Sequence, residues 1–150
     1  MKILNLLILL LITTSCSQTQ NVDTKAANRQ HFEILYLSEY GGEGIEKIEI
    51  FDDSESFTNW WQTSMSDITG STETPKIDFQ REMVIAKHFQ SQRSGGTNYQ
   101  IESVQQAGNT TAIYYSAESP ESIGTTAITS PLMVVVVQKT EEPLVEFKLK

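Results

Sequence analysis

Hydrophobic and polar residues alternate in short runs from residue 31 onward, which is typical of β-strands that bury one face. Phe32, Ile34 and Tyr36 form the first such run. A glycine-rich stretch, EYGGEG, follows it, and Ile48 and Ile50 then share one face of a second run. The sequence therefore predicts two strands that are connected by this turn as a hairpin.

The period changes in the stretch FDDSESFTNWWQTSM, where apolar residues recur every three or four positions: Phe57, Trp60, Trp61 and Met65. We predict one amphipathic helix over residues 54–65, for which Asp52, Asp53 and Ser54 offer capping oxygens. With Glu55, these acids miss the spacing of a calcium-binding loop, so capping is the simpler interpretation. An aromatic cage for a sugar or a cation is the alternative for the paired tryptophans. Their helical spacing favours packing against a sheet.

The rest of the chain contains further strand-forming runs: MVIA, TNYQIESVQQ, TTAIYYSAE, LMVVVVQK and VEFKLK. The continuous apolar runs suit strands that are covered on both faces. In the last run, Val145, Phe147 and Leu149 point inward and the charged residues point outward, which suits an edge strand. The sequence thus predicts an α+β fold over residues 31–150: a single small domain with about seven strands, mainly antiparallel, and one helix.

The N-terminus has the layout of a secretory signal. Lys2 supplies a positive charge and residues 3–12 are apolar except for Asn5. This run is too short to span a membrane, which takes about 20 apolar residues. Small polar residues lead to Cys16, the only cysteine of the chain. The pattern resembles the bacterial lipoprotein signal, although Thr13 stands where that family usually has leucine.

The lipoprotein resemblance implies that residues 1–15 are a signal peptide and that Cys16 becomes an acylated N-terminus. An incidental thiol behind an ordinary signal peptide is the alternative. Residues 16–30 contain a single large aliphatic residue, Val22, so we predict a flexible tether. We expect a lipid-anchored protein of the bacterial cell envelope, in the outer membrane and facing the periplasm, with exposure at the cell surface left open.

Charge and composition exclude some functions. The chain has 19 acidic and 11 basic residues and a formal net charge of −8, which repels nucleic acid. No motif for a cofactor, a metal or a catalytic nucleophile is recognised. Neither His31 nor His88 belongs to a metal-binding motif, and His88 is predicted to be an outward, solvated residue of a strand. We therefore expect no enzymatic activity, no cofactor and no metal.

One ordered set of elements spans residues 55–139. It runs from the helical tryptophans through IDFQREMVIAKHF and a turn with Gly95, Gly96 and Tyr99 to the valine run after Pro131. This order resembles the C-terminal domain of the PrcB family of protease-complex subunits. The resemblance implies a lipoprotein that associates with a secreted or surface protease and assists its assembly or stability. It implies no catalysis by the domain itself.

The turn QSQRSGGTNY carries the candidate site for a protein partner. Arg93 and Tyr99 are the expected anchors, because arginine and tyrosine are enriched at interface hot spots, with Gly95 and Gly96 shaping the turn. The alternative is that the two glycines only supply a positive φ in a strand connection. This chain departs from the family where Thr97 and Asn98 separate the glycines from Tyr99, and again at Leu132, where the family often has an aromatic residue.

We expect a membrane-anchored, non-catalytic binding or accessory subunit, with a protease as the candidate partner. A protease inhibitor or a general envelope adaptor is the alternative, which could receive a peptide along the VEFKLK edge by strand addition. A small hydrolase has no set of residues in its favour.

Overall fold

The computed structural model describes residues 28–71, 73–119 and 127–150. Eight strands and one long helical segment follow each other in the order β1 (Asn28–Gln30), β2 (Glu33–Ser38), β3 (Lys47–Phe51), α1 (Ser54–Trp60), η1 (Trp61–Met65), α2 (Ser66–Thr69), β4 (Glu82–His88), β5 (Asn98–Ala107), β6 (Thr110–Glu118), β7 (Leu132–Gln138) and β8 (Leu144–Leu149). The segment η1 is one turn of π-helix between the two α-helices.

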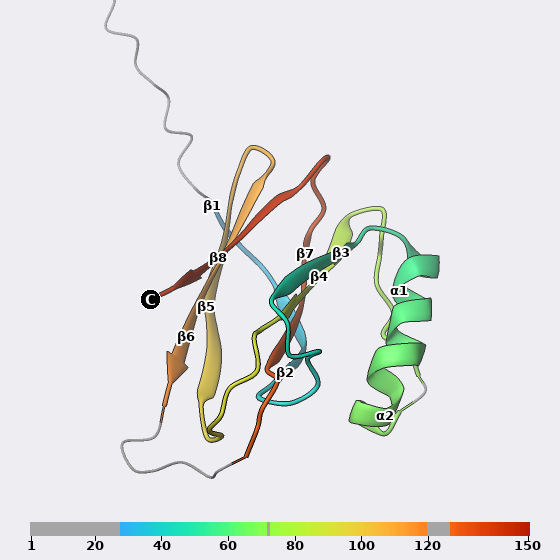
Figure 1. Cartoon of the computed structure of the whole chain (residues 1–150). Helices are drawn as coiled ribbons and strands as arrows, with labels where there is room; N and C mark the ends of the chain where they lie inside the picture. Colours follow the sequence, from blue (N-terminus) through green and yellow to red (C-terminus); the bar gives the residue numbers. More distant parts are fainter. Residues whose placement is uncertain (1–27, 72, 120–126) are drawn as a thin grey trace, which may run out of the picture.

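The strands form two four-stranded sheets, ordered β1-β5-β6-β8 and β2-β7-β4-β3. Every pairing is antiparallel except that of β6 with β8. Figure 1 shows the sheets face to face, with the helical segment on the outer face of the second sheet. The prediction of an α+β fold that is mainly antiparallel is therefore confirmed.

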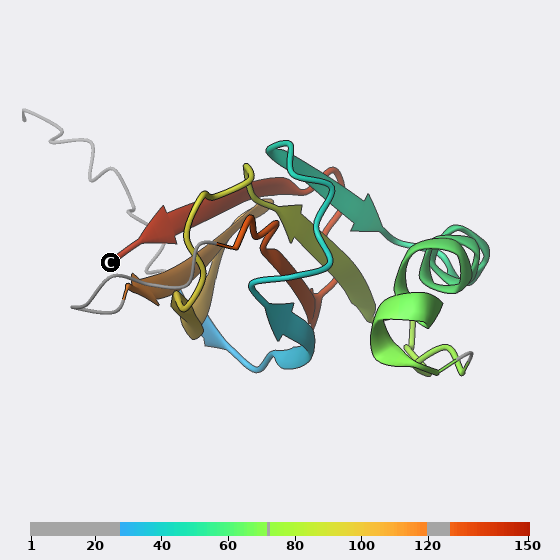
Figure 2. The same cartoon turned by 60° about the horizontal axis from the view of Figure 1, so that its bottom comes forward.

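The two sides of the sandwich differ. On one side, only His31 and Phe32 separate β1 from β2, so the chain itself joins the two sheets. On the other side, the edge strands of the two sheets are β8 and β3 (Figure 2). Lys87, opposite Ile48 of β3, places its ammonium 5.7 Å from the ring of Phe147 in β8. In the described residues, no strand pairing joins these two edges.

Strands β4 and β7 supply apolar side chains to both faces of their sheet. Met83 and Ile85 pack between the two sheets with Val104 and Ile113 of the first sheet. Val84 and Ala86, next to them in sequence, face the helix instead. This double burial explains why both strands are continuous apolar runs rather than alternating ones.

The helical segment begins where the sequence predicts and continues to Thr69, four residues further. Asp53 caps it, because its carboxylate accepts the main-chain N–H groups of Glu55 and Ser56, both at 2.9 Å. The aromatic rings of Phe57, Trp60 and Trp61 pack with Phe51 and Phe79 against the sheet. The prediction that the tryptophans form a packing face is confirmed.

Three local predictions are wrong. The first two strands of the domain, β2 and β3, are not a hairpin but occupy opposite edges of one sheet, separated by β7 and β4. The residues 28–30, predicted to be tether, form β1, which pairs with β5. In addition, a register shift in β2 sends Phe32 to the core between the sheets and Tyr36 to the helix side, although the sequence places them on one face.

The signal peptide, Cys16 and most of the predicted tether lie outside the described residues. In the described part of the chain, no helix combines the length and the apolar character needed to cross a membrane.

Candidate binding site at the loop end

Three loops meet at one end of the sandwich, at the bottom of Figure 1. We call this surface the loop end; it comprises residues 39–46, 89–97 and 127–131. Gly42 donates its N–H to Ser130 O (2.7 Å) and Ser91 donates to Gly44 O (3.0 Å). Gln92 and Thr129 exchange two main-chain hydrogen bonds of 2.9 and 3.0 Å. Backbone bonds therefore hold the three loops in one arrangement.

Glycine is required at the closest approach between these loops. A Cβ atom on Gly42 would lie 2.5 Å from Pro131 O and 2.9 Å from Ser130 O, which are both main-chain atoms that cannot move aside without displacing their loop. Gly44 adopts a φ of +76°, and a Cβ there would lie 2.3 Å from the Ser91 hydroxyl. The stretch EYGGEG is thus a packing element of the loop end rather than a hairpin turn.

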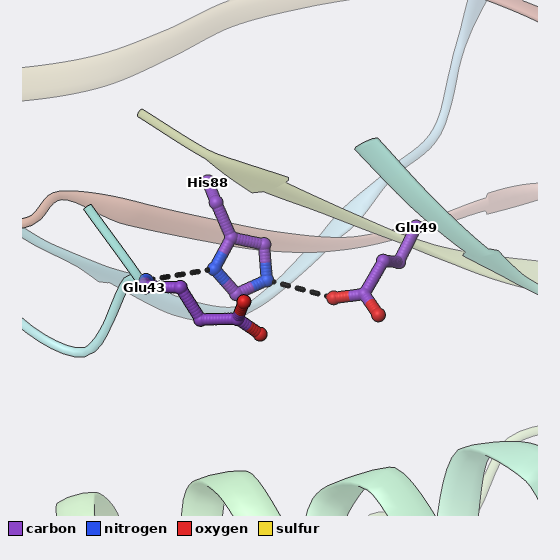
Figure 3. A group of neighbouring side chains, drawn as sticks. All are labelled: Glu43, Glu49 and His88. Atoms are coloured by element: carbon purple, nitrogen blue, oxygen red, sulfur yellow. Dashed lines mark hydrogen bonds and ion pairs between the residues drawn. The ribbon is translucent and has the colours of Figure 1, made fainter. Parts of the chain in front are cut away.

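His88 ties the first loop to the sheet. It is buried at the end of β4, and its Nδ1 accepts the main-chain N–H of Glu43 at 3.2 Å (Figure 3). Because Nδ1 is an acceptor, the proton of the neutral ring is on Nε2, which lies 2.9 Å from Glu49 Oε2. The prediction of an outward, solvated histidine is therefore wrong: Trp60 covers this face of β4.

The side chains of Glu43, Glu49 and His88 offer three possible metal ligands within 4.8 Å of one another. Sequence reasoning missed this juxtaposition because the residues come from a loop and two strands. However, Lys47 already supplies a cation, with its Nζ 2.5 Å from Glu43 Oε1 and 3.1 Å from Glu49 Oε2. A metal on Nε2 would move the ring proton to Nδ1, where it would face the N–H of Glu43. The geometry therefore favours a structural ion-pair cluster.

Burial is the main cause that lowers the pKa of His88, and the positive charge of Lys47 lowers it further. Glu49 and Glu43 act in the opposite direction. The hydrogen bond from Lys47 lowers the pKa of Glu43, so that carboxylate stays ionised. At neutral pH the lowered pKa keeps the imidazole neutral, and the ammonium group of Lys47 pairs with the ionised Glu43.

The loop end exposes side chains of the kind found at protein interfaces. Tyr40 is 49% exposed, Ile45 60% and Ile128 76%, and Arg93 is also exposed. Each of the three loops contributes at least one of these four residues. Because the loops are fixed by main-chain bonds, little conformational freedom would be lost when a partner binds them.

The residues predicted to bind a partner have different surroundings. Arg93 is exposed, whereas Gly95 is buried, and Gly96 has a φ of +95° and donates its N–H to Glu39 Oε2 at 2.6 Å. Tyr99 is buried: its ring packs on Phe89 and its hydroxyl accepts a hydrogen bond from Gln92 at 2.5 Å. Tyr99 therefore packs against the loop of residues 89–97 from inside the fold. Of the two predicted anchors, only Arg93 is accessible to a partner.

Sequence reasoning missed Tyr40, Ile45 and Ile128 as surface residues of this end. Tyr40 and Ile45 flank the glycines that were assigned to a hairpin turn, and Ile128 lies in a long predicted loop. The sequence does contain a feature that could have identified these residues. Large apolar side chains lie inside segments of turn residues, where burial is not expected, and this combination indicates exposed apolar residues.

A hollow of about 1170 Å³ lies at the end of the fold opposite to the loop end, between β1, the residues 78–82 and the residues 136–143. Its lining carries both charge signs. Lys139, which lines it, donates hydrogen bonds to Asp52 O (2.7 Å) and Phe79 O (3.1 Å). This ammonium therefore joins two chain segments, and the hollow gathers no convergent set of ligand-binding groups.

Comparison of the chain with protein-family models, with curated proteins and with solved structures finds no match in any of the three.

Replacement of Gly42 by alanine should destabilise the domain by roughly 1–3 kcal/mol, because the new methyl group cannot fit beside Pro131 without moving a loop. Gly70→Ala is the control: it also loses a glycine, at a φ of +68°, but its Cβ would meet nothing within 4 Å. Urea unfolding followed by tryptophan fluorescence measures both. Because the φ of Gly70 strains an alanine there without any clash, the close contact would be contradicted by a Gly42→Ala variant as stable as the wild type.

The buried His88 should make stability depend on pH below about 6.5, the ordinary pKa of a histidine in the unfolded chain. Because its pKa is lower in the folded state, the unfolded chain takes up a proton first, and the free energy of unfolding falls as the pH falls. One such proton contributes a slope of at most about 1.4 kcal/mol per pH unit. His88→Asn, which keeps an acceptor near the N–H of Glu43, should flatten this slope. An unchanged slope in urea titrations would assign it to other groups.

Proposed function

We propose that this chain is a lipid-anchored, non-catalytic binding subunit of the bacterial cell envelope, and that its partner is a secreted or surface protease that it helps to assemble or stabilise. The observation that carries the binding role is the loop end, where fixed loops expose Tyr40, Ile45, Arg93 and Ile128. The membrane anchor rests on the sequence around Cys16, and the choice of a protease rests on the resemblance to the PrcB family.

The position of the loop end suits a tethered binding protein. The described chain enters the fold at Asn28, which is paired with Gln106 near the end of β5. The loop of residues 89–97 leads instead into the start of β5, at Asn98. The two points are separated by most of a ten-residue strand, roughly 30 Å at about 3.3 Å per residue. A tether that leads to Asn28 would therefore hold the domain at the end opposite to its binding surface.

A protease inhibitor or a general envelope adaptor is the second candidate. The observation that favours an adaptor is the outer edge of β8, which pairs with no strand in the described residues and could receive an extended peptide. An activity assay separates the two roles: an inhibitor lowers the turnover of the captured protease, whereas an accessory subunit maintains or raises it.

The anchor is tested by Cys16→Ser. We expect the wild-type chain in the membrane fraction and the variant in the soluble fraction, because serine cannot form the thioether that carries the acyl chains. Mass spectrometry of the N-terminal peptide supplies the second measurement. Retention of the variant in the membrane, or an unmodified Cys16 in the wild type, would overturn the lipoprotein assignment.

The partner surface is tested by capture of envelope proteins on the full chain, with mass spectrometry of the proteins retained. Tyr40→Ala and Arg93→Ala should each lower capture of the protease by about tenfold or more, the scale of an interface hot spot. Lys76→Ala, which removes an exposed cation outside the loop end, is the matched control. Equal capture by all variants would exclude the loop end, and capture without any protease would leave the adaptor role.

A further inference from the structure

Strand β8 has one edge without a partner in the described residues, and its backbone has a defined orientation. The N–H groups of Leu144 and Lys150 donate to Asn109 O and Tyr115 O, both at 3.0 Å, on the side of β6. Because successive residues of a strand direct their N–H and C=O groups to opposite sides, Val145, Phe147 and Leu149 direct theirs away from β6. Six polar backbone groups therefore face outward from a partly apolar strand.

We propose that this edge pairs with the same edge of a second copy of the chain, so that two β8 strands join antiparallel about a two-fold axis at Phe147. The inference does not depend on the proposed protease or on the anchor. It commits to a second copy because the sequence of β8 is complementary to itself, in charge and in hydrogen bonding, in one register.

In that register, Phe147 lies opposite Phe147 of the second copy, and Val145 lies opposite Leu149. All of these residues have outward backbone groups, so each opposed pair exchanges two hydrogen bonds. Glu146 lies opposite Lys148, and by symmetry Lys148 lies opposite Glu146, in the non-hydrogen-bonded positions where side chains approach most closely. Within one chain, Lys148 Nζ already lies 2.8 Å from Glu146 Oε2, so in the pair the four charges form one cluster of alternating sign across the interface.

The neighbouring registers are worse. Opposed residues of antiparallel strands have their side chains on the same face of the sheet. A shift by one residue would therefore place the inward side chains of one copy on the same face as the outward side chains of the other. A shift by two residues puts Glu146 opposite Glu146, or Lys148 opposite Lys148, and like charges in these positions are destabilising. The charges thus select one pairing of the strand with itself.

Burial and closure agree with this pairing. Leu149 is 64% exposed in the single chain, and in the pair it gains Val145 of the second copy as its cross-strand neighbour. The joined sheet would have a β1 strand at each outer edge, and β1 has only three residues. Because the β8 edge pairs with the same edge of the second copy about a two-fold axis, both copies use it up, and association through β8 stops at two copies.

A charge-exchange experiment on the full chain tests the proposal, with oligomeric state measured by sedimentation in a large excess of detergent micelles. Wild type should change from monomer to dimer between about 1 µM and about 1 mM, since two six-residue strands form a small interface. Glu146→Lys and Lys148→Glu should each weaken the dimer by about tenfold or more, because each places like charges opposite one another.

Mixing is the decisive step. When Glu146→Lys is mixed with Lys148→Glu, every opposed pair carries opposite charges again, so a heterodimer should form although neither variant dimerises well alone. The double variant Glu146→Lys/Lys148→Glu should recover the wild-type constant. Lys76→Glu controls for net charge and should dimerise as wild type does.

Amide hydrogen exchange locates the contact within β8. Dimerisation should slow exchange at Val145, Phe147 and Leu149 but not at Glu146 or Lys148, whose amides already face β6. A wild type that stays monomeric up to about 1 mM would overturn the proposal. So would equal dimerisation of all variants, which would place the interface elsewhere, or a mixture that remains monomeric.

Discussion

The structure depends on the pairing of β4 with β7, because these two strands are the only described elements that carry a core on both faces. Their seven opposed residue pairs run from Glu82 and Gln138 to His88 and Leu132. One face forms the core with the helix, and the other forms the core with the second sheet. A strand in this position must be apolar at nearly every residue. Because it is packed on both faces, its ends are fixed, and so are the starting points of the loops that follow.

The loop end follows from this constraint. Phe89 and Pro131, which directly follow β4 and precede β7, are joined by a main-chain hydrogen bond of 3.0 Å, and the loops of both strands continue side by side from there. The third loop is held from two directions, by Ser130 through the N–H of Gly42 and by His88 through the N–H of Glu43. The ring of His88 can accept the N–H of Glu43 only while its Nδ1 carries no proton. The burial that lowers its pKa therefore also maintains the hydrogen bond that holds this loop.

Local patterns predicted the elements well and their partners poorly. The helix, its aromatic face and the doubly buried strands follow from the spacing of Phe57, Trp60 and Trp61 and from unbroken runs such as MVIA, because each depends only on neighbours in sequence. The pairing of β2 could not be predicted in this way, since it depends on β7, about 100 residues later. His88 and Tyr99 were misplaced for the same reason: whether a polar side chain at the end of a strand is solvated depends on loops that fold over it from elsewhere. Of the two predicted anchors only Arg93 is exposed, whereas the exposed Tyr40 and Ile45 lie in a segment whose glycines indicate a turn.

The two proposed surfaces use different parts of the fold and are compatible with each other. The loop end is built from connections between strands, whereas self-association would use the outward backbone groups of β8. Antiparallel pairing of β8 would reverse the strand direction of the second copy, so that the two loop ends would point in opposite directions along the joined sheet. A single partner molecule could then not contact both loop ends through the same surface. The dimer would instead offer two separate binding sites. It would bind more tightly than the single chain only to a partner that is itself repeated or clustered, because only such a partner can occupy both sites at once.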